Sequence, residues 1–222
     1  MAADSEEEPF LERSGGMYAR STTIHGNPQA IDDGLTYVRD EVMPAVQEMD
    51  GCVGLSMLAD RDTGRCIVTS AWRDADAMHR SAEGVRPLRD RAAEVFGGQL
   101  EVHEWEIAVL HRLHEAPEGA CTRVTWISAE PDEVEHVLDA YRMTVVPRME
   151  EMSGFCSASL FISRGEGRAA VAATFENREA MERTRDQAQA MREAFAMSTG
   201  VAITEVAEFD LLLAHLRVPE MA

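Results

Sequence analysis

Two stretches of this sequence share one unusual plan: "VMPAVQEMDG" at residues 42–51 and "VVPRMEEMSG" at residues 145–154. Each places apolar residues at helical spacing and ends on a glycine, the common stop of a helix. Each also carries a proline, Pro44 or Pro147, inside the helical pattern, where proline removes a backbone hydrogen bond. We expect the helix to bend or split at each proline. The same awkward pattern, written twice at an offset of 103 residues, indicates a duplicated unit.

Shifting the sequence by this offset aligns its two halves without a gap from Arg20 to Arg89. The matches include residues that constrain the backbone: Pro28 with Pro131, Gly51 with Gly154, and Gly64 with Gly167. One residue then enters the second half, after which the alignment continues, pairing Glu104 with Glu208, Trp105 with Phe209, and His111 with His215. Chance produces scattered matches but not coinciding glycines and prolines throughout a unit, so we infer an internal repeat.

Each unit contains the same order of predicted elements. The first is expected to form, in order, a strand at 18–26, a helix from Pro28, a hairpin of strands 52–60 and 65–72, a helix at 74–96 and a strand at 100–110. The strands are apolar or alternating, the hairpin encloses the loop "RDTG", and Asp74 is the expected N-cap of the second helix. Residues 120–214 repeat this βαββαβ order, which is the ferredoxin-like plan.

The predicted fold class is α+β, with two tandem ferredoxin-like units forming an intramolecular dimeric α+β barrel. One such unit covers one face of its sheet with helices and leaves the other face bare. Strands such as "CIVTSAW" at 66–72 are apolar on both faces, so the bare face must also be covered. Two units can bury these faces against each other and close a barrel of eight strands within one chain.

The 222 residues divide into four predicted segments. They are a disordered acidic tail at 1–16, a first unit at 17–113, a linker at 114–119 and a second unit with a C-terminal extension at 120–222. No run of 18 apolar residues and no basic, apolar leader occurs in the sequence, which predicts neither a membrane span nor a secretory signal. The four cysteines form no regular framework and are expected to be reduced in a cytoplasmic protein.

The charge balance limits the class of partner. Arginine supplies all 21 basic residues against 40 acidic ones, a net charge of −19. Such a chain repels phosphate backbones and anionic lipid surfaces, so we expect neither a nucleic-acid nor a membrane partner. The absence of lysine excludes a Schiff-base mechanism that uses a lysine of the protein. A small-molecule ligand and further association into a homo-oligomer both remain open.

Several motifs resemble the antibiotic-biosynthesis-monooxygenase-like (ABM) branch of the dimeric α+β-barrel superfamily. In the first unit they are "WRDADAMH" at 72–79, "DGCVG" at 50–54 and "VHEWEI" at 102–107, each with a counterpart in the second unit. Residues 17–220 also resemble a group of mycobacterial proteins with tandem units of this kind, through segments such as "YARSTTI" and "GFCSASL". The resemblance implies the barrel fold and a pocket on the helix-covered side of each sheet.

The resemblance also implies two chemistries. One is cofactor-independent oxygenation of electron-rich phenols in a dry pocket, and the other is haem binding with a histidine ligand well inside the second helix. The matching stretches at 85–96 and 188–197 contain no histidine, and His79 lies about three turns early, so haem degradation is disfavoured. We therefore expect no cofactor, and no metal site because the sequence has no metal-spaced cluster of histidine and cysteine.

Three aromatic residues, Trp72, Trp105 and Phe175, are the predicted ligand contacts. Trp72 ends a central strand and would either stack on an aromatic ligand or pack in the core. Phe175 at the matching position keeps the bulk without the N–H group, which favours packing.

Two histidines are the candidate catalytic residues. His25 closes the first predicted strand and His79 starts the second helix, and we expect both at the same end of the first unit. Together they would supply a general base near neutral pH, and the competing interpretation is that both are surface histidines. The second unit has Ser128 and Glu182 at these positions, so any catalysis is expected in the first unit.

Matched charges predict two structural ion pairs. The first and last strands of a unit are antiparallel neighbours in this fold, so Arg20 is expected beside Glu104 or Glu106, and Arg123 beside Glu208 or Asp210, inside or at the rim of the barrel. Anion binding by these arginines is the competing interpretation.

The expected function is binding of a small aromatic or polyketide-like molecule, with cofactor-independent oxygenation as the reaction if the protein is an enzyme. The first alternative is a non-enzymatic structural or assembly protein whose pockets are filled by its own side chains. The second is haem binding.

Overall fold

The computed structural model describes residues 16–216. The predicted acidic tail, apart from Gly16, and the end of the predicted C-terminal extension, 217–222, lie outside the described residues. The first unit comprises β1 (Tyr18–His25), α1 (Ile31–Tyr37), α2 (Met43–Gln47), β2 (Cys52–Ala59), β3 (Arg65–Trp72), α3 (Ala75–Arg80), α4 (Ala82–Phe96) and β4 (Gln99–Arg112). The second comprises β5 (Cys121–Ser128), α5 (Val134–Ala140), α6 (Val146–Glu150), β6 (Phe155–Ser163), β7 (Arg168–Phe175), α7 (Arg178–Arg183), α8 (Arg185–Thr199) and β8 (Ala202–Leu216).

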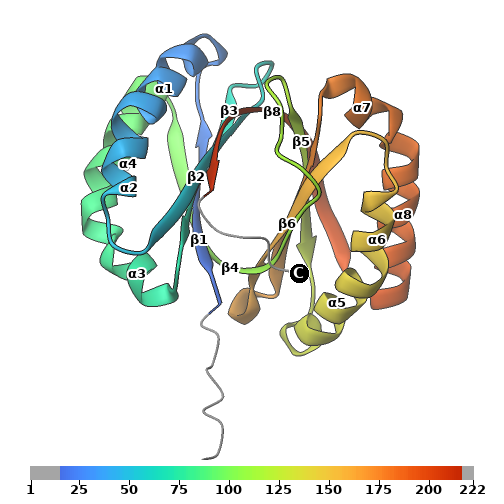
Figure 1. Ribbon diagram of the computed structural model, residues 1–222. Helices are drawn as coiled ribbons and strands as arrows, with labels where there is room; N and C mark the ends of the chain where they lie inside the picture. Colours follow the sequence, from blue (N-terminus) through green and yellow to red (C-terminus); the bar gives the residue numbers. More distant parts are fainter. Residues whose placement is uncertain (1–15, 217–222) are drawn as a thin grey trace, which may run out of the picture.

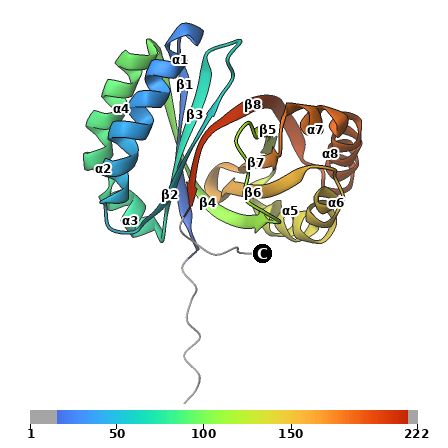
Figure 2. The ribbon, with the colours of Figure 1, turned by 45° about the horizontal axis from the view of Figure 1, so that its top comes forward.

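The strands form one closed barrel in the order β1-β3-β2-β8-β5-β7-β6-β4. The helices of each unit cover the outside of their own sheet, so the barrel lies between two helical layers (Figures 1 and 2). Each strand of the first unit is four places around the ring from its counterpart in the second. A pseudo-twofold axis therefore runs along the barrel and puts equivalent residues at the same level. The structure confirms the predicted intramolecular α+β barrel.

The long strands β4 and β8 close the barrel. The first part of β4 pairs with β1, placing Arg20 opposite Glu104, and its last part pairs with β6, placing Arg112 opposite Ser157. In the same way β8 pairs first with β5 and then with β2 of the other unit. Every sheet edge is therefore paired, which removes the exposed backbone groups that promote aggregation.

Alternation along each strand divides its side chains between two apolar layers. In β3, Ile67, Thr69 and Ala71 face the barrel interior, whereas Cys66 and Trp72 belong to the core beneath the helices. All four cysteines are free thiols, as predicted. No helix within residues 16–216 is long and apolar enough to cross a membrane.

The two prolines of the repeated pattern do not split the first helix of each unit. Instead, a π-helical turn precedes each of them, at Val38–Val42 and at Tyr141–Val145. The N–H of Met43 bonds to the carbonyl of Val38, and the N–H of Val146 to that of Tyr141. This wider turn accommodates the missing proline donor, so the chain continues as a helix into α2 and α6.

A testable consequence concerns Gly34, which is buried in α1 where that helix approaches α4. A Cβ at this position would overlap the aromatic ring of Phe96. Gly34→Ala should therefore lower the free energy of unfolding by about 1–3 kcal/mol, although alanine is the better helix former. Gly165→Ala, whose added Cβ meets nothing within 4 Å, is the matched control. Equal urea midpoints for the two variants would contradict this packing.

Candidate functional site in the barrel interior

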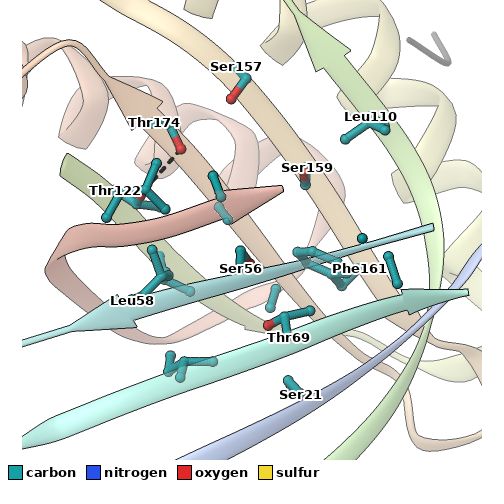
Figure 3. A pocket seen from close by; sticks show the side chains of 18 of the residues that line it. Ser21, Ser56, Leu58, Thr69, Leu110, Thr122, Ser157, Ser159, Phe161 and Thr174 are labelled. Atoms are coloured by element: carbon teal, nitrogen blue, oxygen red, sulfur yellow. Dashed lines mark hydrogen bonds between the residues drawn. The ribbon is translucent and has the colours of Figure 1, made fainter. Parts of the chain in front are cut away.

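A large cavity lies inside the barrel. It has a volume of about 490 Å³ and is lined by all eight strands and by the linker after β4. Figure 3 shows side chains from both units pointing into it. The resemblance implied a pocket on the helix-covered side of each sheet; the structure has one of about 40 Å³ in the second unit, and its large cavity lies in the barrel instead. The inward side chains are too small to fill the barrel, whereas the helix side of the first unit is filled by large ones.

Hydroxyl groups line much of the cavity. Three of them, Ser21, Thr69 and Ser56, occupy register positions on the adjacent strands β1, β3 and β2. A second row crosses the other sheet at the level of Thr122, Thr174 and Ser157. The hydroxyls of Thr122 and Thr174 are 2.9 Å apart and form a hydrogen bond (Figure 3). These groups can donate to or accept from a ligand without placing a formal charge inside the barrel.

Aromatic residues form the other part of the wall. Trp105 lines the cavity, and its Nε1 donates to the hydroxyl of Ser21 at 2.8 Å. Trp126 and Phe161 also line it. Neither was among the predicted ligand contacts, although Trp126 follows Thr122 and Val124 at the two-residue spacing that puts all three on one strand face. The predicted ligand contact Trp105 thus faces a cavity, but one in the barrel and not beneath the helices.

Two arginines close the end of the barrel where β3 and β7 begin. Arg65 stacks over Trp126, with its Cζ 4.5 Å from the ring centroid, and forms an ion pair with Glu205. The equivalent Arg168 lies over Trp105 at 5.9 Å and its Nη2 is 3.0 Å from Nδ1 of His103. Each arginine thus contacts an aromatic residue of the other unit. Cation–π stacking and ion pairing together hold these charges in place.

The opposite end of the cavity opens beside the linker. His114 and Glu115 line the cavity here and are exposed, so solvent reaches the interior from this side. Arg112 at the end of β4 also lines this mouth and is half-buried. The cavity is therefore polar and open at the linker end, and aromatic at the other end, near which the two paired arginines lie.

Trp72 does not face a cavity. It is fully buried in the helix-side core of the first unit, together with Met57 and Met78, and its Nε1 donates to Ser70 at 3.0 Å. In the second unit Phe175 occupies the equivalent position and lines a cavity of only about 40 Å³. The smaller ring leaves room that the indole fills in the first unit.

The structure separates the two candidate catalytic histidines. His25 ends β1 opposite Arg65, whereas α3, which carries His79, begins after Trp72, the partner of Tyr18 at the other end of β1. Both rings are at least half exposed, His25 lying 4.0 Å from Glu101 and His79 3.4 Å from Glu104. Neither lines the barrel cavity. The prediction that they share one end of the unit is wrong, because β3 runs antiparallel to β1.

Arg20 and Arg123 each lie beside the expected carboxylate. The Nη2–Oε1 distance is 2.7 Å for Arg20 and Glu104, and 2.9 Å for Arg123 and Glu208. Both arginines are only 3% exposed. They face the helices and not the barrel interior, since each also donates to a helix carbonyl, that of Met78 or of Met181.

The two arginine sites differ at one hydrogen bond. Nη1 of Arg20 donates to the hydroxyl of Ser81 at 2.9 Å. In the second unit the equivalent Thr184 donates its hydroxyl to the carbonyl of Met181, and Nη1 of Arg123 has no hydrogen-bond partner among the described residues. Arg123 also lines the 40 Å³ cavity of the second unit.

Two proteins of Mycobacterium tuberculosis strain H37Rv match nearly the whole chain. The uncharacterized protein Rv2557 is 52% identical over 205 residues, covering 92% of this chain and 92% of its own length. The uncharacterized protein Rv2558 is 50% identical over 214 residues, covering 96% of this chain and 91% of its own length. No protein-family model matches the sequence.

Solved structures share the fold at low sequence identity. A "Putative monooxygenase" from Fusobacterium nucleatum has a TM-score of 0.68 at 11% identity, over 91% of this chain and 95% of that one. An anthrone oxidase-like protein has a TM-score of 0.65 at 14% identity, over 95% of this chain and 97% of that one. A ferredoxin fold protein of Listeria monocytogenes, related to antibiotic biosynthesis monooxygenases, has a TM-score of 0.53 at 9% identity, over 89% of this chain and 96% of that one. These likenesses establish the fold alone.

Filling the small cavity of the second unit should stabilise the protein. Phe175→Trp combined with Ala173→Ser copies the Trp72–Ser70 pair of the first unit. At about 24 cal/mol per Å³ the 40 Å³ void corresponds to about 1 kcal/mol. The free energy of unfolding measured in urea should rise by this amount, whereas Phe175→Ala should lower it by about 3–5 kcal/mol. A double variant less stable than the parent would show that the site cannot accept an indole.

Glu208 should make stability depend on acid pH. Burial alone would raise the pKa of its carboxyl, but hydrogen bonds and attraction from Arg123 and Arg185 outweigh burial and hold the pKa below its ordinary value. As pH falls, the unfolded state therefore binds a proton at this carboxyl before the folded state does. The contribution of Glu208 to the free energy of unfolding is complete above the unfolded pKa of about 4.3 and is lost as pH falls towards the lowered folded pKa.

Glu208→Gln should accordingly cost about 1.5–3 kcal/mol at pH 7, the typical loss for a hydrogen bond to a charged group. The difference from the parent should shrink as pH falls below about 4.3. Urea unfolding of both proteins across this range measures it. A difference that stayed constant with pH would contradict the lowered pKa.

Proposed function

We propose that this chain, which belongs to the family of the mycobacterial proteins Rv2557 and Rv2558 and folds as an ABM-like dimeric α+β barrel, binds a small, largely aromatic molecule inside its barrel. The observation that carries the proposal is the cavity of about 490 Å³. This volume falls within the range of about 300–1,000 Å³ that is usual for small-molecule sites.

The chemistry of the lining supports an aromatic ligand. Trp105, Trp126 and Phe161 offer ring faces and edges, and aliphatic side chains such as Leu58 and Ile67 complete the apolar wall. The hydroxyl rows supply a few hydrogen bonds that would orient the ligand without a large desolvation cost. A flat, fused-ring molecule with one or two oxygen substituents fits this combination of walls.

Cofactor-independent oxygenation is the second candidate. It is favoured by the fold shared with the "Putative monooxygenase" and the anthrone oxidase-like protein. Such a reaction needs a base that removes a proton from the substrate. His103 lines the cavity, but Nη2 of Arg168 is placed to donate to its Nδ1, which occupies the lone pair that would accept the proton. This contact supports binding over catalysis, and oxygen consumption with any bound phenol tests the second candidate directly.

The two remaining alternatives find less support. A structural protein with filled pockets agrees with the packed surroundings of Trp72 but leaves the barrel cavity without a purpose. Haem binding beneath the helices would need a large pocket, whereas the helix-side cavity of the second unit measures about 40 Å³. Titration with haemin, followed by its Soret absorption, tests that alternative.

The proposal predicts that a neutral aromatic probe, naphthalene-2-carboxamide, binds with one-to-one stoichiometry in isothermal titration calorimetry. Trp105 and Trp126 line the cavity, so binding should also quench tryptophan fluorescence. Ala172→Phe places an aromatic ring in the cavity and should weaken binding at least about tenfold, because the ring takes up volume that the ligand needs. Ala190→Phe, on the exposed face of α8, is the matched control. No saturable heat, or equal affinity for both variants, would sink the proposal.

A further inference from the structure

We infer that the ligand of the barrel carries an acid group, which binds Arg112 at the mouth while the aromatic body enters the cavity. This inference rests on the proposed function and names the substrate class of the same site: an aromatic carboxylic acid. It follows from three independent features: an unpaired cation at the mouth, a row of hydroxyls beside it, and a neutralised closed end.

The first feature is Arg112. This residue lies on the part of β4 that crosses to the second unit, lines the cavity and is half-buried. The other arginines of the barrel wall are paired, Arg65 with Glu205 and Arg168 with Glu166. No side-chain hydrogen bond or ion pair joins Arg112 to another described residue. In a chain with a net charge of −19, a cation left without a carboxylate beside a cavity is suited to an anion from outside.

The second feature is the polar row that ends at Arg112. Thr122, Thr174, Ser157 and Arg112 occupy register positions on the adjacent strands β5, β7, β6 and β4. Neighbouring strands lie about 4.8 Å apart, so one carboxylate can accept from the guanidinium and from the hydroxyl of Ser157 at the same time. Arg112 and Ser157 are thus the residues that would hold the acid.

The first unit lacks this arrangement at the same level of the barrel. Its equivalent row consists of Ala19, Ala71 and Gly54, and the residue equivalent to Arg112 is Leu216. At this level the wall of the second unit therefore carries hydroxyl groups, whereas the corresponding positions of the first unit, Ala19, Ala71 and Gly54, carry none. This asymmetry would give a bound acid one preferred orientation.

The third feature is the opposite end of the cavity. Arg65 lies at that end but does not line the cavity, and its charge is offset by Glu205 and stacked on the ring of Trp126. That end offers aromatic surface and no free cation among the described residues that line it. The body of the ligand would therefore point towards Trp126 and its acid group towards the mouth.

Glu115 opposes the acid and provides a second test. It is the one carboxylate among the described residues lining the cavity, and it is exposed on the linker beside the mouth. A like charge near the site weakens anion binding. Removing this charge should strengthen binding of an acid and leave a neutral ligand unaffected.

The experiment compares two probes of the same shape, naphthalene-2-carboxylate and naphthalene-2-carboxamide, by calorimetry on the full chain at pH 7.4. The parent protein should prefer the carboxylate by about tenfold, the usual order for a charge-assisted hydrogen bond. Arg112→Gln should remove this preference and leave the carboxamide within about twofold of its parent affinity. Glu115→Gln should raise the carboxylate affinity alone. Arg148→Gln, an exposed arginine on α6 outside the cavity, is the control for net charge.

The outcomes separate the inference from the proposed function. Equal affinities of the parent for the two probes, or a Glu115→Gln variant that binds both as the parent does, would overturn the acid assignment while leaving the cavity as a binding site. Loss of both probes in a folded Arg112→Gln protein would assign Arg112 a packing role and also overturn it. Binding of neither probe by the parent would remove the proposed function and this inference with it.

Discussion

The constraint on which this structure depends is that each four-stranded sheet carries buried apolar side chains on both faces, including Ile67, Trp105 and Val124 on the inner face. The helices cover one face of each sheet, and only the other sheet is available for the second. The strands β4 and β8 satisfy the constraint because each leaves its own unit and pairs with the other, so that no edge remains open. Closing the ring creates an enclosed space whose size is set by the inward side chains. The candidate site exists because many of those side chains are serine, threonine and alanine.

The two units share a plan but have diverged where chemistry is possible. On the helix side, Trp72 fills the first unit, whereas Phe175 leaves a small void beside Arg123 in the second. At the mouth of the barrel, hydroxyls and Arg112 lie on one wall and small apolar residues on the other. Each unit can thus be compared with the other position by position. Where equivalent positions carry different residues, the fold does not require either residue.

Much of the fold could be predicted from the sequence because its signals are local and occur twice. The matched glycines, prolines and strand patterns predicted the elements and the barrel, and the antiparallel neighbours β1 and β4 brought Arg20 and Glu104 together as expected. The π-helical turns were not foreseen, since a proline in a helix can be accommodated in several ways.

The site was harder to predict because its volume depends on the sizes of side chains from strands far apart in the sequence. The volume left inside a barrel follows from all inward side chains at once, and no local pattern reports it. His25 and His79 were misplaced for a related reason: the end of the sheet at which a helix begins depends on the direction of the strand before it. Trp126 was not predicted as a cavity residue because the alternation along residues 121–128 does not say which face of the strand becomes the inner one.

One feature of the connectivity has an evolutionary meaning. In a barrel assembled from two identical chains, every substitution on the inner wall appears twice, related by the dyad, and a cation at one rim imposes another across from it. Here the segment between β4 and β5 joins the two walls covalently, so each can vary alone. A single chain of this kind can therefore evolve an asymmetric cavity with two different ends, which a symmetric pair of subunits cannot offer to a ligand.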